Sequence, residues 1–149
     1  MTLARVMVVD DFKPFRNFVC EMMEKLQNLQ VICEASDGPE AVLKAVELKP
    51  DLILLDIGLP GLNGIDAARQ IRKLVPESKI IFLSQESSSD VVQEALSLGA
   101  FGYVVKIYAG IDLPKAIEAA CHGRQFASGG LADHKLETQV PSQRPLTSS

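Results

Sequence analysis

Leu52-Ile53-Leu54-Leu55-Asp56 is the stretch that decides the fold. A continuous apolar run, rather than an alternation of apolar and polar residues, is typical of a strand that is covered on both faces in a parallel sheet. Similar runs occupy residues 6–9, 80–83 and 103–105, and a weaker one occupies residues 31–33. The sequence therefore predicts five buried strands.

Helical patterns separate these runs. Apolar residues spaced by three and four positions form stripes within residues 15–26, 41–46, 65–75 and 91–98. Asp37 and Glu40 are spaced as a capping box before the second stripe. A fifth helix is expected to be capped by Asp112, to carry Pro114 in its first turn and to close at Gly123. Five strand–helix units in a row predict an α/β fold, an open, doubly wound five-stranded parallel sheet in the order 2-1-3-4-5 with five helices.

Composition narrows the classes of protein. The chain has 149 residues, of which 47% are hydrophobic and 23% charged, as in a globular domain and unlike a disordered chain. The net charge of −4 disfavours a domain that coats nucleic acid. No apolar run is long enough for a membrane span. Three scattered cysteines form no disulfide framework and no zinc-binding pattern, so we expect a reducing cytoplasm. The three cysteines are Cys20, Cys33 and Cys121.

The chain divides into a folded part and a tail. We expect residues 1–127 to form one domain and residues 128–149, which carry no apolar stripe, to form a flexible tail. A helix-turn-helix unit needs about 50 residues, so we expect this chain itself to bind no nucleic acid.

Polar residues follow four of the five predicted strands. Asp10 and Asp11 end the first strand, Asp56 the third, Ser84 the fourth and Lys106 the fifth. In an open α/β sheet, ligands bind beyond these carboxyl ends. Two like charges about 4 Å apart repel by about 4 kcal/mol at an effective dielectric near 20, so a converging acidic cluster favours a divalent cation. Carboxylate oxygens suit Mg²⁺, and a nearby lysine and hydroxyl suit a phosphoryl group, which Asp56 could accept as a nucleophile. Taken singly, each of these residues is more often a cap or a solvated terminator.

The set resembles a known family. The acids, Ser84 and Lys106 are spaced as in the CheY-like receiver domain of two-component response regulators, whose fold is flavodoxin-like. Two further segments resemble this family: residues 56–64 (DIGLPGLNG) resemble its loop after the phosphorylated Asp, and residues 98–106 (LGAFGYVVK) resemble its run into the fifth strand. The resemblance covers roughly residues 3–127 and is nearest to the receiver half of LuxR-type (FixJ/NarL-like) regulators.

The resemblance implies a role for each residue. Asp56 would accept a phosphoryl group from a sensor histidine kinase or a phosphotransfer protein. Mg²⁺ would be held by Asp11, Asp56 and the backbone carbonyl of Gly58, with Asp10 acting through water. Lys106 would contact the phosphoryl group. Ser84 and Tyr103 would shift on phosphorylation and so remodel the surface for an output partner, with a transient homodimer as one possible assembly.

Some features depart from the family pattern. Ile107 follows Lys106 where many relatives have proline, and we expect a trans peptide there because a cis bond before a non-proline costs about 2.5 to 4 kcal/mol. The DNA-binding domain that accompanies LuxR-type receivers is missing, so the chain is either a stand-alone receiver or a fragment of a longer regulator. Two other classes stay open, a magnesium-dependent phosphohydrolase and a flavodoxin-like binding module without phosphotransfer.

Overall fold

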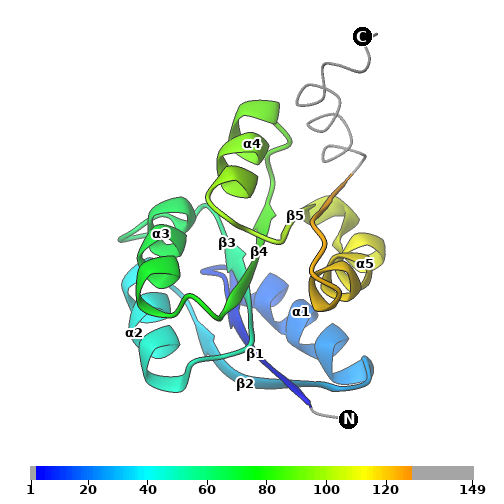
Figure 1. The fold of residues 1–149 in the computed structure, drawn as a ribbon. Helices are drawn as coiled ribbons and strands as arrows, with labels where there is room; N and C mark the ends of the chain where they lie inside the picture. Colours follow the sequence, from blue (N-terminus) through cyan, green and yellow to red (C-terminus); the bar gives the residue numbers. More distant parts are fainter. Residues whose placement is uncertain (1–2, 129–149) are drawn as a thin grey trace, which may run out of the picture.

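A computed structural model describes residues 3–128 and shows one parallel sheet between two layers of helices (Figure 1). The strands are β1 (Ala4–Val9), β2 (Leu29–Ala35), β3 (Leu52–Asp56), β4 (Lys79–Ser84), β5 (Gly102–Val105) and β6 (Phe126–Ala127). The helices are α1 (Lys13–Lys25), α2 (Gly38–Leu48), α3 (Gly64–Leu74), α4 (Ser89–Ser97) and α5 (Ala109–Cys121), with a 3₁₀ turn, η1, at Lys106–Tyr108. The predicted fold class is confirmed.

The sheet order is β2-β1-β3-β4-β5-β6, with every pair parallel. The first five positions are those predicted, and β6 adds a sixth. Hydrophobic periodicity could not predict β6, because two residues are too few to show a period. Its last residue is followed by Ser128, which is buried and whose Oγ accepts a hydrogen bond from the Val105 N–H at 2.9 Å. The folded part therefore extends at least to Ser128, and the rest of the predicted tail lies outside the described residues.

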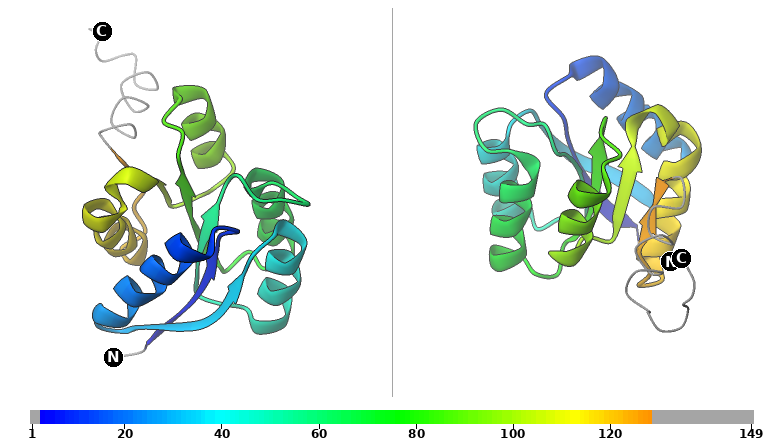
Figure 2. Two further views of the ribbon diagram at one scale, coloured as in Figure 1. Left: turned by 180° about the vertical axis from the view of Figure 1, so that it is seen from behind. Right: turned by 90° about the horizontal axis from the view of Figure 1, so that it is seen from above.

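The two faces of the sheet carry separate apolar cores. Seen from above, α1 and α5 cover one face and α2, α3 and α4 cover the other (Figure 2). Val8, Leu54 and Leu83 point into the first core, while Val9 and Leu55 point into the second. Both faces are thus filled, which explains why the strands read as continuous apolar runs. Within residues 3–128, no helix is long and apolar enough to cross a membrane.

The helix boundaries follow the predicted signals with one exception. The Asp37 side chain accepts a hydrogen bond from the Glu40 N–H at 2.7 Å, as predicted for the start of α2. The predicted start of α5 was wrong, because η1 leads directly into the helix and starts it at Ala109, but its end agrees with the prediction: the helix stops at Cys121, just before Gly123, whose φ is 72°. Asp112 consequently lies in the first turn instead of capping it, and Pro114 lies inside the helix.

Candidate functional site

The predicted site residues meet at one edge of the sheet. Asp10 and Lys106 directly follow β1 and β5, while Asp56 and Ser84 are the last residues of β3 and β4. Because parallel strands end at the same edge, residues that are far apart in the chain become neighbours there. Asp56, Ser84 and Lys106 line an open pocket of about 560 Å³ there, while Asp10 is fully buried beside it. Its lining includes Asp11, Phe12, Phe15, Asp56, Ile57, Gly58, Ser84, Gln85, Glu86, Lys106 and Ile107.

Three carboxylates converge in this region. Oxygen atoms of Asp10, Asp11 and Asp56 lie within 4.8 Å of one another. Asp10 is fully buried, Asp56 is nearly so, and Asp11 is exposed. An exposed acid beside two buried ones gives a ligand set that a cation can approach from solvent.

Lys106 compensates part of this negative charge. Its Nζ lies 2.7 Å from Asp10 Oδ2 and 3.4 Å from Asp56 Oδ1. The aliphatic stem is packed so that the ammonium also sits 4.7 Å from the centre of the Phe15 ring. One ammonium against three carboxylates leaves a net charge of about −2, which a divalent cation would balance.

The electrostatics of Asp56 follow from its position. Burial raises the pKa of Asp56 above its ordinary value, and repulsion by Asp10 adds to this effect. Lys106 and the Gly58 N–H, which donates to Asp56 Oδ1 at 3.1 Å, oppose it. The ionised form of Asp56 is therefore disfavoured by its surroundings, and a bound cation would stabilise it.

The loop after Asp56 is fixed by a close approach. A Cβ on Gly64 would collide with the backbone carbonyl oxygen of Asp56 and with Ile57. The Gly64 N–H donates to the Ile57 carbonyl at 2.7 Å, and Asn63 caps α3 by accepting from the Asp66 N–H. Glycine at position 64 therefore lets α3 begin directly against the residue that carries the central carboxylate.

Ser84 and Tyr103 both hydrogen-bond to the backbone of Glu86 in the β4–α4 loop, but only Ser84 lines the pocket. Ser84 lines the pocket, and its Oγ accepts from the Glu86 N–H at 3.0 Å. Tyr103 is fully buried in the core, and its hydroxyl donates to the Glu86 carbonyl at 2.9 Å. Burial raises the pKa of Tyr103. Glu86 is therefore the residue that links the two predicted switch residues.

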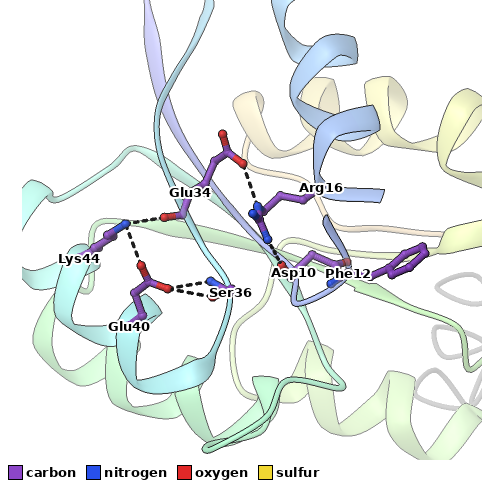
Figure 3. A network of polar contacts seen from close by, with 7 residues as sticks. All are labelled: Asp10, Phe12, Arg16, Glu34, Ser36, Glu40 and Lys44. Atoms are coloured by element: carbon purple, nitrogen blue, oxygen red, sulfur yellow. Dashed lines mark hydrogen bonds and ion pairs between the residues drawn. The ribbon is translucent and has the colours of Figure 1, made fainter. Parts of the chain in front are cut away.

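The sequence reasoning missed two contributors. Glu86 acts through its backbone, which no side-chain pattern could reveal. Arg16 lies in the first turns of α1 among apolar residues, and this one charged residue on a half-buried face was the available signal. Its Nη1 donates to the Asp10 carbonyl at 2.7 Å and its Nε to Glu34 Oε1 at 2.8 Å (Figure 3).

The donor set fits a hard cation. All three side chains offer oxygen, the donor that Mg²⁺ prefers, and Asp10, Asp11 and Asp56 form the one such cluster found within residues 3–128. No peptide bond in the described part of the chain is cis, so the bond before Ile107 is trans as expected. The role of the Gly58 carbonyl as a Mg²⁺ ligand stays a prediction.

Comparison with known proteins agrees with this geometry. Residues 6–118 match the response regulator receiver domain family. The chain belongs to this family. It is 37% identical over 138 residues to the transcriptional regulatory protein LiaR of Bacillus subtilis, which covers 93% of this chain and 61% of that protein. It is 33% identical over 128 residues to the nitrate/nitrite response regulator protein NarL of Escherichia coli, covering 86% of this chain and 59% of that protein.

Solved structures of receivers superpose closely on this one. A LuxR-family two-component response regulator from Aurantimonas matches with a TM-score of 0.85 and 34% identity, over 93% of this chain and 99% of that chain. The response regulator domain of Thermotoga maritima CheB matches with a TM-score of 0.71 and 34% identity, over 78% of this chain and 96% of that one. This receiver domain spans about three fifths of the length of the curated relatives that it matches.

Proposed function

We propose that this receiver domain takes a phosphoryl group on the Asp56 carboxylate in the presence of Mg²⁺ and passes that state to a partner. The observation that carries the proposal is the convergence of three carboxylate side chains within 4.8 Å, with the Lys106 ammonium among them. A metal-free carboxylate cluster of this kind is unfavourable, and membership of the receiver family supplies a reason for keeping it.

Asp56 is the proposed nucleophile. One of its oxygens attacks the phosphorus atom, the bond from phosphorus to the donor breaks, and the donor leaves with that electron pair. Asp11, Asp56 and the Gly58 carbonyl would hold Mg²⁺, with Asp10 contributing through water. The ion would supply charge neutralisation for the phosphoryl oxygens.

Lys106 and Ser84 are the proposed contacts to the transferred group. The Lys106 ammonium lies 3.4 Å from Asp56 Oδ1 and would pair with a phosphoryl oxygen on that carboxylate. Ser84 can donate its hydroxyl proton to a second oxygen, and we propose that its movement toward that oxygen breaks the bond that it accepts from the Glu86 N–H. This exchange would release one of the two bonds that fix Glu86, the other being the one from Tyr103. The β4–α4 loop and its neighbours would then rearrange as a two-state switch.

Exposed apolar side chains at the pocket mouth support a protein as the donor. Phe12 and Ile107 line the pocket with exposed fractions of 61% and 82%, and Tyr108 and Ile111 are exposed nearby on η1 and α5. An apolar rim of this kind suits a docking protein that presents a phosphohistidine, such as a sensor histidine kinase or a phosphotransfer protein. We place the protein in the cytoplasm, where such donors act.

The output is a signal rather than turnover. The LiaR and NarL relatives are regulators that are longer than this chain, so we propose that the receiver controls either a separate partner or a domain joined to it. A transient homodimer is one way to report the phosphorylated state. Steady release of phosphate from added phosphate esters would instead favour a phosphohydrolase.

Intact-mass measurement tests the proposal. The wild-type protein is incubated with acetyl phosphate and Mg²⁺, and we expect a mass increase of one phosphoryl group. Asp56→Asn should show no increase, while Asp90→Asn, which alters an exposed acid in the first turn of α4, should be labelled like the wild type. An unlabelled wild type, or equal labelling of Asp56→Asn, would overturn the assignment.

A further inference from the structure

We propose that Arg16 is a positioning residue for the magnesium ligands, acting through the main chain of Asp10 and oriented by Glu34. This inference rests on the proposed function. It assigns a task to a charged residue that touches neither the pocket nor the transferred group.

Arg16 makes two charged hydrogen bonds in different directions. Its Nη1 donates to the Asp10 carbonyl at 2.7 Å, and its Nε donates to Glu34 Oε1 at 2.8 Å (Figure 3). Its side chain is only 14% exposed, against 44% for Glu34. A guanidinium can serve both acceptors at once because its donors form a rigid fork, which a lysine ammonium lacks.

The carbonyl that Arg16 bonds is that of Asp10, which directly precedes Asp11 in the chain. The carbonyl of Asp10 and the N–H of Asp11 belong to one planar peptide unit, so fixing the carbonyl fixes the direction in which the chain enters Asp11. The other groups of Asp10 are held as well: its N–H donates to the Ala35 carbonyl at 3.1 Å, and its Oδ1 accepts from the Phe12 N–H at 2.8 Å. Asp11 is exposed, and no hydrogen bond or ion pair holds its carboxylate within residues 3–128. Its orientation therefore depends on the peptide unit that Arg16 secures.

Glu34 is itself fixed from the other side. It lies near the end of β2, opposite Val8 in the sheet register. Its carbonyl accepts from Lys44 Nζ at 2.6 Å, and Lys44 also pairs with Glu40 at 3.0 Å. Glu40 in turn accepts from the Ser36 N–H at 2.9 Å. The contacts thus run from Lys44 and Glu40 on α2, through Glu34 on β2, to Asp10 at the end of β1 (Figure 3).

Two explanations of the contacts of Arg16 predict opposite changes in Mg²⁺ affinity when Arg16 is removed. If Arg16 acted only through its charge, its removal would strengthen Mg²⁺ binding, because a positive group near the acids repels the ion. If Arg16 positions the ligands, its removal weakens binding. Partners of metal ligands of this kind typically contribute about 10- to 100-fold in affinity.

The test is calorimetric titration of the full chain with Mg²⁺ alone. We expect Arg16→Met to weaken Mg²⁺ binding about tenfold, Arg16→Lys and Glu34→Gln to weaken it less, and Glu34→Gln to add nothing in the Arg16→Met background. Arg69→Met is the matched control, because Arg69 also pairs with two carboxylates, Asp66 at 2.9 Å and Glu94 at 2.7 Å, on the α3–α4 side. It should leave Mg²⁺ affinity unchanged.

A spectroscopic readout separates positioning from general damage. The backbone ¹⁵N resonance of Asp11 responds to the hydrogen bond on the preceding carbonyl, so it should shift in Arg16→Met without Mg²⁺, while resonances of α3 and α4 stay in place. Unchanged or tighter Mg²⁺ binding by a folded Arg16→Met protein would overturn the inference and leave the proposed function intact. Failure of the wild type to bind Mg²⁺ would instead overturn both.

Discussion

The two sides of the pocket are held by different kinds of interaction. On the β1–α1 side, residues 10–16, Arg16 and Lys106 make charged bonds of 2.7 Å to the carbonyl and carboxylate of Asp10. On the β4–α4 side, residues 84–91, two neutral bonds of 3.0 and 2.9 Å hold Glu86 through Ser84 and Tyr103. Charged hydrogen bonds are roughly twice as strong as neutral ones.

The two sides of the pocket therefore differ in how firmly they are held. On the side that carries two of the acids, charged bonds hold the carbonyl and the carboxylate of Asp10, which opposes the repulsion between the acids. The side that carries Ser84 is held by weaker bonds, and we expect it to rearrange more easily. A bridge from Arg69 to Glu94 also ties α4 to α3, but its partners are about half exposed, and exposed pairs of this kind contribute little.

The largest expected effect is a loss of Mg²⁺ affinity when an acid on the β1–α1 side is replaced. Asp11→Asn should weaken Mg²⁺ binding by about 100-fold or more, since it removes a ligand charge and even outer partners contribute about 10- to 100-fold. Ser84→Ala should leave Mg²⁺ affinity unchanged, because Ser84 is not one of the three clustered acids and its proposed contact is the phosphoryl group. Calorimetric titration measures both. Equal losses in the two variants would remove the distinction between the sides.

A second prediction uses a cysteine beside the Arg16–Glu34 pair. Burial, with a smaller contribution from Glu34, raises the pKa of Cys20 to about 11. At pH 8 we expect iodoacetamide to modify Cys20 at least about tenfold more slowly than the exposed Cys121, because only the thiolate reacts. Glu34→Gln should speed the reaction of Cys20. Peptide mapping by mass spectrometry gives both rates, and a Cys20 that reacts as fast as Cys121 would contradict this packing.

A third prediction loosens the β4–α4 side. Tyr103→Phe removes the hydroxyl that donates to the Glu86 carbonyl, and we expect it to lower the free energy of unfolding by about 1 kcal/mol. Amide exchange should accelerate in the loop between β4 and α4 and stay unchanged in the first turn of α1. Denaturant unfolding and hydrogen exchange check the two parts. Faster exchange on both sides would show that they do not move independently.

The smallest expected effect concerns Asp56, which lies between the two sides. Its pKa is raised in the folded protein, so its contribution to stability is present below the ordinary carboxyl pKa of about 3.9 and is lost as the pH rises through the raised value. Without Mg²⁺ at pH 7, Asp56→Asn should therefore be more stable than the wild type, by about 0.5 kcal/mol, and this advantage should disappear in acid.

Urea unfolding in EDTA measures this advantage. Added Mg²⁺ should stabilise the wild type and leave Asp56→Asn nearly unaffected, because a ligand stabilises only the state that binds it. An Asn variant that is less stable at pH 7 than the wild type would show that Lys106 outweighs both burial and the repulsion by Asp10.

Sequence reasoning predicted the fold and the meeting of the acids for the same physical reason. Apolar runs such as residues 52–55 identify strands covered on both faces, and parallel strands must end at one edge, so Asp10 and Asp56 had to be neighbours. The start of α5 and the strand β6 were missed because the first depends on a 3₁₀ turn and the second has two residues. Glu86 was missed because it acts through its own backbone, which residue types do not reveal. Arg16 was missed because its partner is a backbone carbonyl, although a charge on a half-buried helix face was a signal.

The bond between Val105 and Ser128 has a consequence for any output. Val105 immediately precedes Lys106, and its N–H is held by the last described residue of the chain. Anything joined to the chain after Ser128 is thus one hydrogen bond away from the strand that presents the site ammonium. If the proposed phosphorylation shifts β5, holding Ser128 in place would oppose phosphorylation by the same free energy with which phosphorylation displaces Ser128.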